Sequence, residues 1–493
     1  PLDDLVAERV ETIVIALAPS ADYSAVQPGL VSVALLDDEA PVLEVAPGDT
    51  NMFELHAADT GSFTITRLGE TNIEIFAVNY LLSGAAEPGI DYTLPGELGG
   101  FTLAAGVVDY SLLVTPIDDS ENEGDETITL TLDPDSPEYQ VGASASATIR
   151  IRDNELPPAR VLFADDFDSG AGENWTQVFG ANNGIFDATV AFGHDYSQNG
   201  VGSAPRSSGG TTRGLFIQVN KQDATPGGSA AVNLYPTGRE FRGNYALRFD
   251  MLLNFGAAST TEHALAGLNH SGLLTNRVTQ SVDTNNTTRG GDGIWVAIET
   301  DGSANREYGA YSYSAPGSAP GLLTNRSAAA MSPFIPAPPY AFAGSPGNQG
   351  SGGNRVWAQV ELRQLYGRIG LLINRALVYE FPNTSGFSAG TVMIGHNDQF
   401  DSIGSPEAYV LFDNVEVVSL DLEITGVSFP DGAMALDFVA PLGGAASSFT
   451  VESSPVLPAT DWEPEPATIE ATPTGFRAVI PRPNATRFLR IRN

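Results

Sequence analysis

The sequence predicts an all-β protein built from several sandwich modules. Apolar and polar residues alternate over short runs, such as residues 127–132 and 148–152, which is typical of strands that bury one face. Between such runs, 52 Gly and 33 Pro are spread along the chain, and no long stretch has a helical period. Short strands separated by turn residues indicate sandwiches or barrels. The length of 493 residues predicts about three or four domains.

The composition limits the kinds of molecule that this chain can bind. Asp and Glu number 60 against 24 Lys and Arg, which gives a formal net charge of −36. Such a chain repels nucleic acid and anionic membrane surfaces and attracts divalent cations. The absence of Cys excludes disulfides and thiol chemistry, so a metal ion is the expected source of extra stability in small extracellular modules. No apolar run reaches the roughly 18 residues of a membrane span.

An internal repeat organises the first third of the chain. Residues 3–11 and 118–126 both read D-D-x-x-x-E-x-x-E, and each block runs into a strand that begins Thr-Ile. Each copy later closes on a strand that runs into acids, at residues 35–39 and 151–155. The opening blocks lie 115 positions apart and the closing blocks 116. Two matched blocks at nearly one spacing predict a tandem module of roughly 115 residues.

The repeated acids are candidate ligands for Ca²⁺. Several carboxylates gather at one place only if something cancels their repulsion, and Ca²⁺ takes six to eight oxygen ligands. The alternative is a solvated acidic loop. The duplication of the acidic block favours the metal site over this alternative. With Gly89-Ile90-Asp91-Tyr92-Thr93, the acidic block and the closing Asp-Asn-Glu, residues 42–156 resemble a Calx-β domain, an immunoglobulin-like sandwich of exchangers and bacterial surface proteins. The resemblance implies the ligands Asp91, Asp118, Asp119, Glu123, Glu126 and Asp153.

Residues 1–41 match only the last strands of the same module. The corresponding ligands would be Asp3, Asp4, Glu8, Asp37 and Asp38, with no counterpart of Asp91. Half a sandwich exposes an apolar sheet edge, so we expect either an upstream half in a longer product or strands from a partner. The expected partners are therefore other copies of the chain or neighbouring surface proteins, joined through strand edges into a layer or filament.

Residues 157–420 are predicted to form one larger sandwich. The opening Asp165-Asp166-Phe167 and the closing Phe412-Asp413-Asn414-Val415 resemble a concanavalin-like, LamG-type jelly roll, whose first and last strands pair. That pairing would bring Asp166 toward Asp413 as a second Ca²⁺ site; the alternative is that these acids cap strand ends. Such folds bind glycans through exposed aromatic side chains, but Trp295, Trp357 and Tyr366 each lie in an alternating apolar strand and are better explained as core residues.

The remaining features favour a structural role. Residues 421–493 resemble a small fibronectin-III-like module of large secreted bacterial proteins. The E-x-D-x-x-E pattern of laminarinase-like jelly rolls, the H-E-x-x-H motif and the P-loop are absent from the sequence. We therefore expect a non-enzymatic, secreted or cell-surface structural or adhesive protein with Ca²⁺ as its cofactor. The alternatives are a lectin-like protein that binds glycans through residues 157–420, or an accessory region of a secreted hydrolase.

Overall fold

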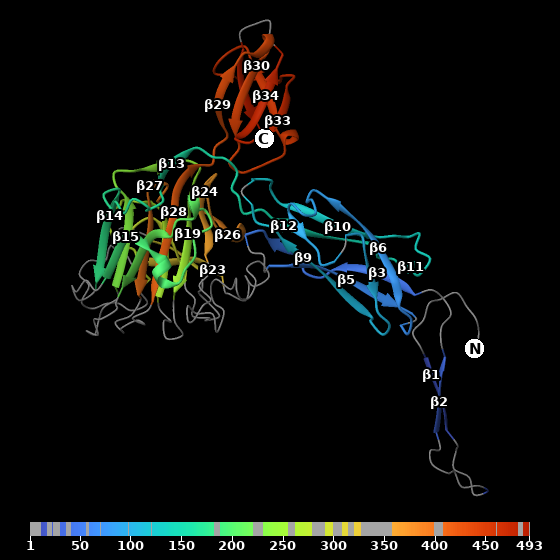
Figure 1. The fold of residues 1–493 in the computed structure, drawn as a ribbon. Coiled ribbons are helices and arrows are strands. Elements are labelled where there is room, and N and C mark those ends of the chain that lie inside the picture. The colour runs from blue at the N-terminus through green and yellow to red at the C-terminus, as the bar shows by residue number, and fades with distance from the viewer. Residues whose placement is uncertain are drawn as a thin grey trace. The chain divides into compact units, whose positions relative to one another are not determined.

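The chain divides into two compact units, residues 1–155 and 156–493, which are described separately here (Figure 1). The computed structural model describes residues 11–16, 22, 30–35, 41–55, 59–69, 71–96, 98–119, 121–181, 188–219, 230–254, 262–278, 291–298, 308–313, 320–326, 357–398, 408–459, 461–481 and 487–492. The all-β prediction is confirmed: in this part of the chain the regular elements are strands and short 3-10 turns. No helix in the described residues is long and apolar enough to cross a membrane.

Residues 42–152 form a sandwich of two five-stranded sheets. One sheet has the order β4-β12-β10-β6-β8 and the other β11-β3-β5-β9-β7. The strands are β3 (Val42–Pro47), β4 (Asn51–Phe53), β5 (Gly61–Leu68), β6 (Ile75–Gly84), β7 (Tyr92–Thr93), β8 (Gly100–Leu103), β9 (Asp109–Pro116), β10 (Glu126–Leu132), β11 (Gln140–Val141) and β12 (Ser146–Arg152).

Alternation along these strands builds the core of this sandwich. In β10, Ile128 and Leu130 are fully buried, and Ile149 of β12 is 1% exposed. They pack with side chains of the opposite sheet, such as Phe63 and Leu112. The intervening Thr and Arg residues of β10 and β12 face outward. The sequence prediction that both runs are two-faced strands is therefore confirmed.

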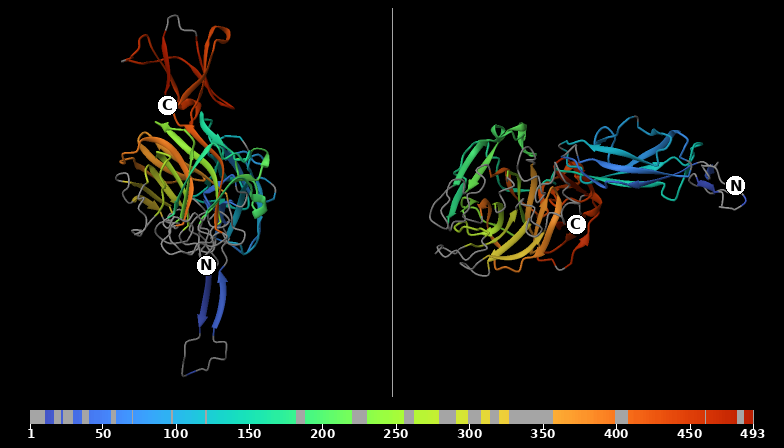
Figure 2. Two further views of the ribbon diagram at one scale, coloured as in Figure 1. Left: turned by 90° about the vertical axis from the view of Figure 1, so that its left-hand side faces the viewer. Right: turned by 90° about the horizontal axis from the view of Figure 1, so that it is seen from below.

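A separate two-stranded ribbon precedes this sandwich. Strand β1 (Glu11–Ala16) pairs antiparallel with β2 (Leu30–Leu35). In the described part of the chain, neither strand pairs with a third one. Figures 1 and 2 show this ribbon, in dark blue, with no further strand alongside.

The second unit contains a large sandwich of two eight-stranded sheets. One has the order β15-β16-β28-β19-β24-β25-β26, with β13 also paired to β28; the other has the order β14-β17-β27-β20-β21-β22-β23, with β18 also paired to β27. The strands are β13 (Val161–Asp165), β14 (Trp175–Ala181), β15 (Ala188–Asp195), β16 (Arg213–Val219), β17 (Ala230–Pro236), β18 (Phe241–Arg242), β19 (Tyr245–Asn254), β20 (Glu262–His270), β21 (Ile294–Ile298), β22 (Tyr308–Tyr313), β23 (Pro320–Arg326), β24 (Ala358–Leu365), β25 (Arg368–Ile373), β26 (Ala376–Pro382), β27 (Ala389–Asp398) and β28 (Tyr409–Ser419).

The first and last strands of this sandwich pair, as the sequence predicts. Strand β13 runs antiparallel to β28, with Asp165 opposite Val415. The two sheets enclose a core of mainly aliphatic and aromatic side chains that includes Leu247, Phe249, Ile394 and Phe412. The 3-10 turns η1 (Tyr196–Asn199) and η2 (Ser208–Gly210) lie in the segment between β15 and β16.

The C-terminal strands form two small sheets around their own core. The sheets have the orders β29-β30-β34-β33 and β32-β31-β35. The elements are β29 (Glu423–Ser428), η3 (Pro430–Gly432), β30 (Met434–Val439), η4 (Ala446–Ser448), β31 (Thr450–Ser454), β32 (Glu463–Pro464), β33 (Thr468–Thr472), β34 (Gly475–Ile480) and β35 (Phe488–Arg492). Phe438, Phe449 and Phe476 pack against one another at its centre.

Candidate metal centre

Strand register brings acidic residues together at one end of the first sandwich. Strand β4 runs parallel to β12 with Phe53 opposite Arg152, so Glu54 and Asp153 leave the sheet side by side. The backbone N–H of Glu54 donates to the carbonyl of Arg152 over 3.0 Å. At the same end Glu126 opens β10, opposite Ile151 of β12.

The opposite sheet supplies the other acids. Strand β7 pairs with β9, with Tyr92 opposite Pro116. Asp91 therefore stands next to the residues that follow β9, and its carbonyl accepts a 2.9 Å hydrogen bond from the backbone N–H of Ile117. Asp118 and Asp119 follow directly, and the backbone N–H of Asp119 donates to Glu54 Oε1 over 3.3 Å. Residues from the ends of five strands, β4, β7, β9, β10 and β12, thus converge.

The first carboxylate group consists of Asp91, Glu123 and Glu126. One oxygen of each lies within 4.8 Å of the others. Asp91 is 6% exposed, and its Oδ2 accepts a 2.6 Å hydrogen bond from the backbone N–H of Glu87. Its Oδ1 is buried and has no hydrogen-bond donor among the described residues. A buried carboxylate oxygen beside two further carboxylates needs either a cation or a proton on a neighbouring carboxyl.

The second group consists of Glu54, Asp153 and Glu155, whose oxygens also lie within 4.8 Å of one another. Asp153 is 2% exposed; its Oδ2 accepts from the backbone N–H of Gly124 over 2.6 Å and its Oδ1 from that of Glu155 over 2.7 Å. These bonds fix the loop before β10 against the end of β12, so the two groups are held next to each other.

The electrostatics of the cluster favour protonation or a bound cation. Burial and the charge of Asp153 raise the pKa of Glu54 to about 8. Burial, with Asp91 and Glu123, raises the pKa of Glu126 to about 7. Burial and Asp153 raise the pKa of Glu155 to about 9.

Basic side chains are scarce in this sandwich. Between residues 42 and 155 the Lys and Arg residues are Arg67, Arg150 and Arg152, and the one His, His56, lies outside the described residues. Arg150 pairs with Asp125 over 3.5 Å, and Arg67 donates to the carbonyl of Ile73. Within the described residues, no Lys or Arg forms an ion pair with Asp91, Glu123 or Glu126. An arrangement of carboxylate oxygens without a protein cation fits a hard, oxygen-preferring ion such as Ca²⁺.

All six acids predicted from the second copy of the repeat lie in this cluster or beside it. The structure adds Glu54 and Glu155, which the sequence reasoning did not count as ligands. Glu155 belongs to the recognised closing motif, but Glu54 precedes the repeated blocks and occurs in only one copy, so the repeat could not reveal it. The candidate ligands in the first copy, Asp3, Asp4, Glu8, Asp37 and Asp38, lie outside the described residues.

The proposed pair in the larger sandwich has a different environment. The Oδ1 of Asp166 accepts from the backbone N–H of Asp168 over 3.1 Å. The Oδ2 of Asp413 accepts from the hydroxyls of Tyr196 over 2.9 Å and Ser207 over 3.1 Å. In the described part of the chain, neither acid belongs to a group of three potential metal ligands. Burial raises the pKa of Asp413 to about 7.

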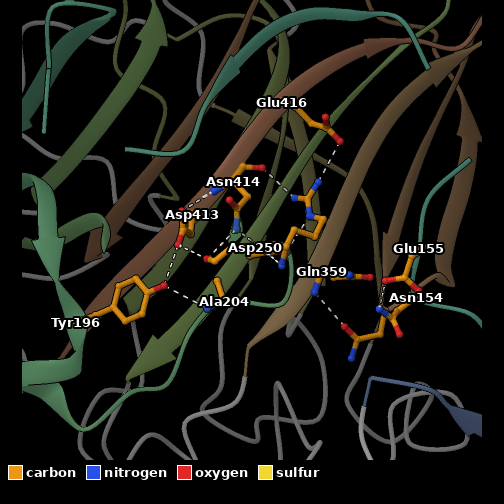
Figure 3. A network of polar contacts seen from close by, with 12 residues as sticks. Asn154, Glu155, Tyr196, Ala204, Asp250, Gln359, Asp413, Asn414 and Glu416 are labelled. Atoms are coloured by element: carbon orange, nitrogen blue, oxygen red, sulfur yellow. Dashed lines mark hydrogen bonds and ion pairs between the residues drawn. The ribbon is translucent and has the colours of Figure 1, made fainter. Parts of the chain in front are cut away.

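Asp413 instead belongs to a polar network with Tyr196, Asp250, Asn414 and Glu416 (Figure 3), in which Arg206 forms ion pairs with Asp250 and Glu416. The guanidinium donates to Asp250 Oδ1 and Glu416 Oε1, each over 3.0 Å, and to the carbonyl of Asn414. Asp250 is fully buried and also accepts from the side-chain amide of Asn414 over 2.8 Å. These contacts tie the segment before β16 to strands β19 and β28.

The aromatic residues considered for glycan binding are mostly core residues. Trp295 is fully buried and stacks on Tyr311 with ring centroids 4.7 Å apart. Trp357 is 8% exposed and donates its indole N–H to the carbonyl of Gly202. The core interpretation is confirmed for Trp295 and Trp357, but it is wrong for Tyr366, which lies in the turn between β24 and β25 and is 78% exposed.

A polar cavity of about 480 Å³ lies at one edge of the larger sandwich, where β20 ends and β27 begins. Its lining includes Asn269, His270, Asp292, Phe387 and Thr391, with Arg239 and Glu240 from the turn after β17. His270 Nδ1 lies 3.2 Å from Asp292 Oδ1. His270 Nε2 and Thr391 Oγ1 are buried without hydrogen-bond partners among the described residues.

The sequence contains one pattern that is typical of hydrolases, but the backbone around it differs from that of a hydrolase. Residues 386–390 read Gly-Phe-Ser-Ala-Gly, which matches the G-x-S-x-G pattern of hydrolases. That motif works on a strand-to-helix turn, whereas Ser388 directly precedes strand β27. The pattern therefore lacks the backbone that would present a nucleophile.

No protein-family model and no curated protein matches this chain. Similar solved structures include the apo form of the Calx CBD1 domain, with 22% identity, coverage of 23% of this chain and 98% of that chain, and a TM-score of 0.20. A Bacillus subtilis protein of unknown function with a galectin-like fold has 9% identity, coverage of 54% and 98%, and a TM-score of 0.32.

A further similar structure is the carbohydrate binding module CBM66 from Bacillus subtilis, with 13% identity, coverage of 50% of this chain and 96% of that chain, and a TM-score of 0.24. At these identities and TM-scores, the matches carry no argument about the function of this chain.

Proposed function

We propose that this chain is a non-enzymatic structural or adhesive protein of an extracellular or cell-surface setting, in which Ca²⁺ stiffens the sandwich of residues 42–156. The observation that carries the proposal is the buried, unpartnered Oδ1 of Asp91 beside Glu123 and Glu126. Carboxylates from both sheets meet there, so an ion bound to them would hold the two sheets together at that end.

Bound Ca²⁺ would supply positive charge that offsets carboxylate repulsion. Asp91, Glu123 and Glu126 would hold one ion, and Glu54, Asp153 and Glu155 form a second group that would hold another. Because these residues lie at strand ends and in the loop before β10, bound Ca²⁺ would order that loop and reduce bending of the module.

Titration calorimetry of the full chain with Ca²⁺ tests the proposal. Replacing one of several carboxylate ligands, as in Asp91→Asn, should weaken binding about tenfold or more. The matched control is Asp135→Asn, which removes the same charge from an exposed position of the same sandwich. No measurable Ca²⁺ binding, or equal weakening by both variants, would contradict the metal site.

The His270–Asp292 pair resembles part of a catalytic triad, but its geometry does not suit catalysis, which supports the non-enzymatic part of the proposal. His270 and Asp292 form a hydrogen-bonded pair, but the His270 side chain is fully buried. Among the described residues, no hydroxyl group hydrogen-bonds to His270 Nε2. A general base must reach the proton that it removes. This imidazole is better explained as a structural group that orders the segments at the cavity.

A second candidate function is glycan binding at the polar cavity. The cavity combines hydrogen-bonding groups with the apolar ring of Phe387, which is the mixture that sugar sites require. Arg239 and Glu240 are exposed at its edge, so their replacement should leave the fold intact. A glycan array with the double variant Arg239→Ala, Glu240→Gln tests this function: a glycan signal that the variant removes would support it, and a signal that it leaves unchanged would not.

A further inference from the structure

The β1–β2 ribbon repeats the geometry of β10 and β12. In β10–β12, Ile128 pairs with Ile149 and Leu130 with Ala147. In β1–β2, Ile13 pairs with Val33 and Ile15 with Val31. Adding 115 to the residue numbers of β1 and 116 to those of β2 gives the pairing of β10 with β12. These two numbers are also the spacings of the repeated sequence blocks.

The two ribbons differ in what covers them. Ile128, Leu130, Ala147 and Ile149 are between 0 and 7% exposed. Their counterparts Ile13, Ile15, Val31 and Val33 are 50, 58, 60 and 49% exposed. Four branched apolar side chains exposed on one face of an isolated ribbon are unfavourable in water, because transfer of apolar surface out of water stabilises the folded state.

The complete sandwich shows what the missing cover is. The free edge of β10 is taken by β6, and the free edge of β12 by β4. The shared face packs on the opposite sheet, through side chains such as Phe63 of β5 and Leu112 of β9. The strands β4, β5, β6 and β9, which provide this cover, all lie within residues 42–116.

We propose that the β1–β2 ribbon is a docking surface for a partner segment equivalent to residues 42–115, which completes a second sandwich of the same kind. The partner would add one strand to each edge of the ribbon and a second sheet over Ile13, Ile15, Val31 and Val33. Another copy of residues 1–493 does not fit this role, because its own segment 42–116 is already closed by its own β10 and β12. This inference is independent of Ca²⁺ binding and of the proposed function.

The repeat permits a direct test without a designed linker. Residues 1–4 read Pro-Leu-Asp-Asp and residues 116–119 read Pro-Ile-Asp-Asp. Fusing an additional copy of residues 42–115 ahead of Pro1 in the full chain therefore reproduces the junction between residues 115 and 116. The readout is amide hydrogen exchange of β1 and β2, and the amides of β10 and β12 report in the same experiment that the original sandwich is intact.

In the unmodified chain we expect fast exchange in β1 and β2, because an isolated two-stranded ribbon is only marginally stable. In the fused chain, exchange of these amides should slow by at least about 100-fold, toward that of a sandwich core. Unchanged exchange in the fused chain would overturn the proposal. Equal slowing in the unmodified chain on raising its concentration would overturn it in favour of self-association.

Two substitutions on one strand separate docking from general effects. Ile15→Asp places a charge on the face that the partner would cover and should abolish the slowing in the fused chain. Val14→Asp places the same charge on the opposite face, which corresponds to the outward-facing Thr129 of the complete sandwich, and should retain most of it. Equal loss in both variants would show that no specific face is covered, and would overturn the proposal.

Discussion

Without metal, the stability of the first sandwich should fall as the pH rises from 5 to 8. The pKa values of Glu54, Glu126 and Glu155 lie at about 8, 7 and 9 in the folded chain, against an ordinary value of 4.5. Below pH 4.5 these groups are protonated in both the folded and the unfolded state, so they do not change the free energy of unfolding. Between pH 4.5 and their folded-state pKa values, the unfolded state releases protons more easily, and the folded state loses stability.

The size of the effect follows from the burial of the site. Each unit between the folded and unfolded pKa of one group corresponds to about 1.4 kcal/mol of unfolding free energy. Glu54 is 6% exposed, but Asp118, Asp119 and Glu123 open the cluster to solvent, which screens its charges. We therefore expect about 2–3 kcal/mol for the whole site rather than the sum over its members. For a module of about 115 residues this is a shift of roughly 10 °C in Tm.

With bound Ca²⁺, the stability of the first sandwich should rise with pH instead of falling. The ion binds deprotonated carboxylates, so its stabilisation grows over the same pH range, and at 100 times its Kd it adds about 2.7 kcal/mol. Scanning calorimetry of the full chain in chelator and in excess Ca²⁺ at pH 5, 6.5 and 8 measures both effects. Glu54→Gln should raise the Tm of the affected transition in chelator at pH 8. A chelated transition that is independent of pH, or higher at pH 8 than at pH 5, would refute the reasoning.

Three further outcomes are expected. Arg206→Ala leaves the fully buried Asp250 without its cation and should destabilise the larger sandwich by about 3–5 kcal/mol in urea unfolding, whereas Arg242→Ala, which breaks an exposed pair, should cost less than about 1 kcal/mol. Gly84→Ala should lower the Tm of the first sandwich, because Gly84 has a φ of +135° and a Cβ would lie 1.9 Å from the carbonyl oxygen of Thr127. Hydrolase assays on polysaccharide and peptide substrates should stay at background, and turnover that is lost on replacing one carboxylate of residues 157–420 would contradict the non-enzymatic proposal.

Local patterns predicted the parts of the fold that depend on local physics. Alternation predicted β10 and β12, because each buries one side of a pleated strand. The repeat predicted the acids around Asp118, because two copies of one block are visible without any structure. The opening and closing residues of the larger sandwich predicted the pairing of β13 with β28, although that contact joins residues about 250 positions apart.

Contacts that depend on the register between distant strands could not be predicted from the sequence. Glu54 reaches the acidic cluster only because β4 runs parallel to β12 and ends beside Asp153. Arg206 meets Asp250 and Glu416 from a segment without regular strand pattern, so no spacing marks it as their partner. The same limit explains why the sequence places Asp413 in a metal site, whereas the structure surrounds it with hydroxyl and backbone donors.

The two units solve the problem of buried acids in different ways, and the difference supports a metal in the first unit. In the larger sandwich, Asp250 receives the guanidinium of Arg206 and the amide of Asn414, so the protein itself satisfies the charge. In the first sandwich, Asp91 has an orphaned buried oxygen, and two acids approach it instead of a base. Natural sequences remove such conflicts unless the site is functional. A conflict that a divalent cation would resolve, at the place where both sheets end, is what a metal-stiffened module requires.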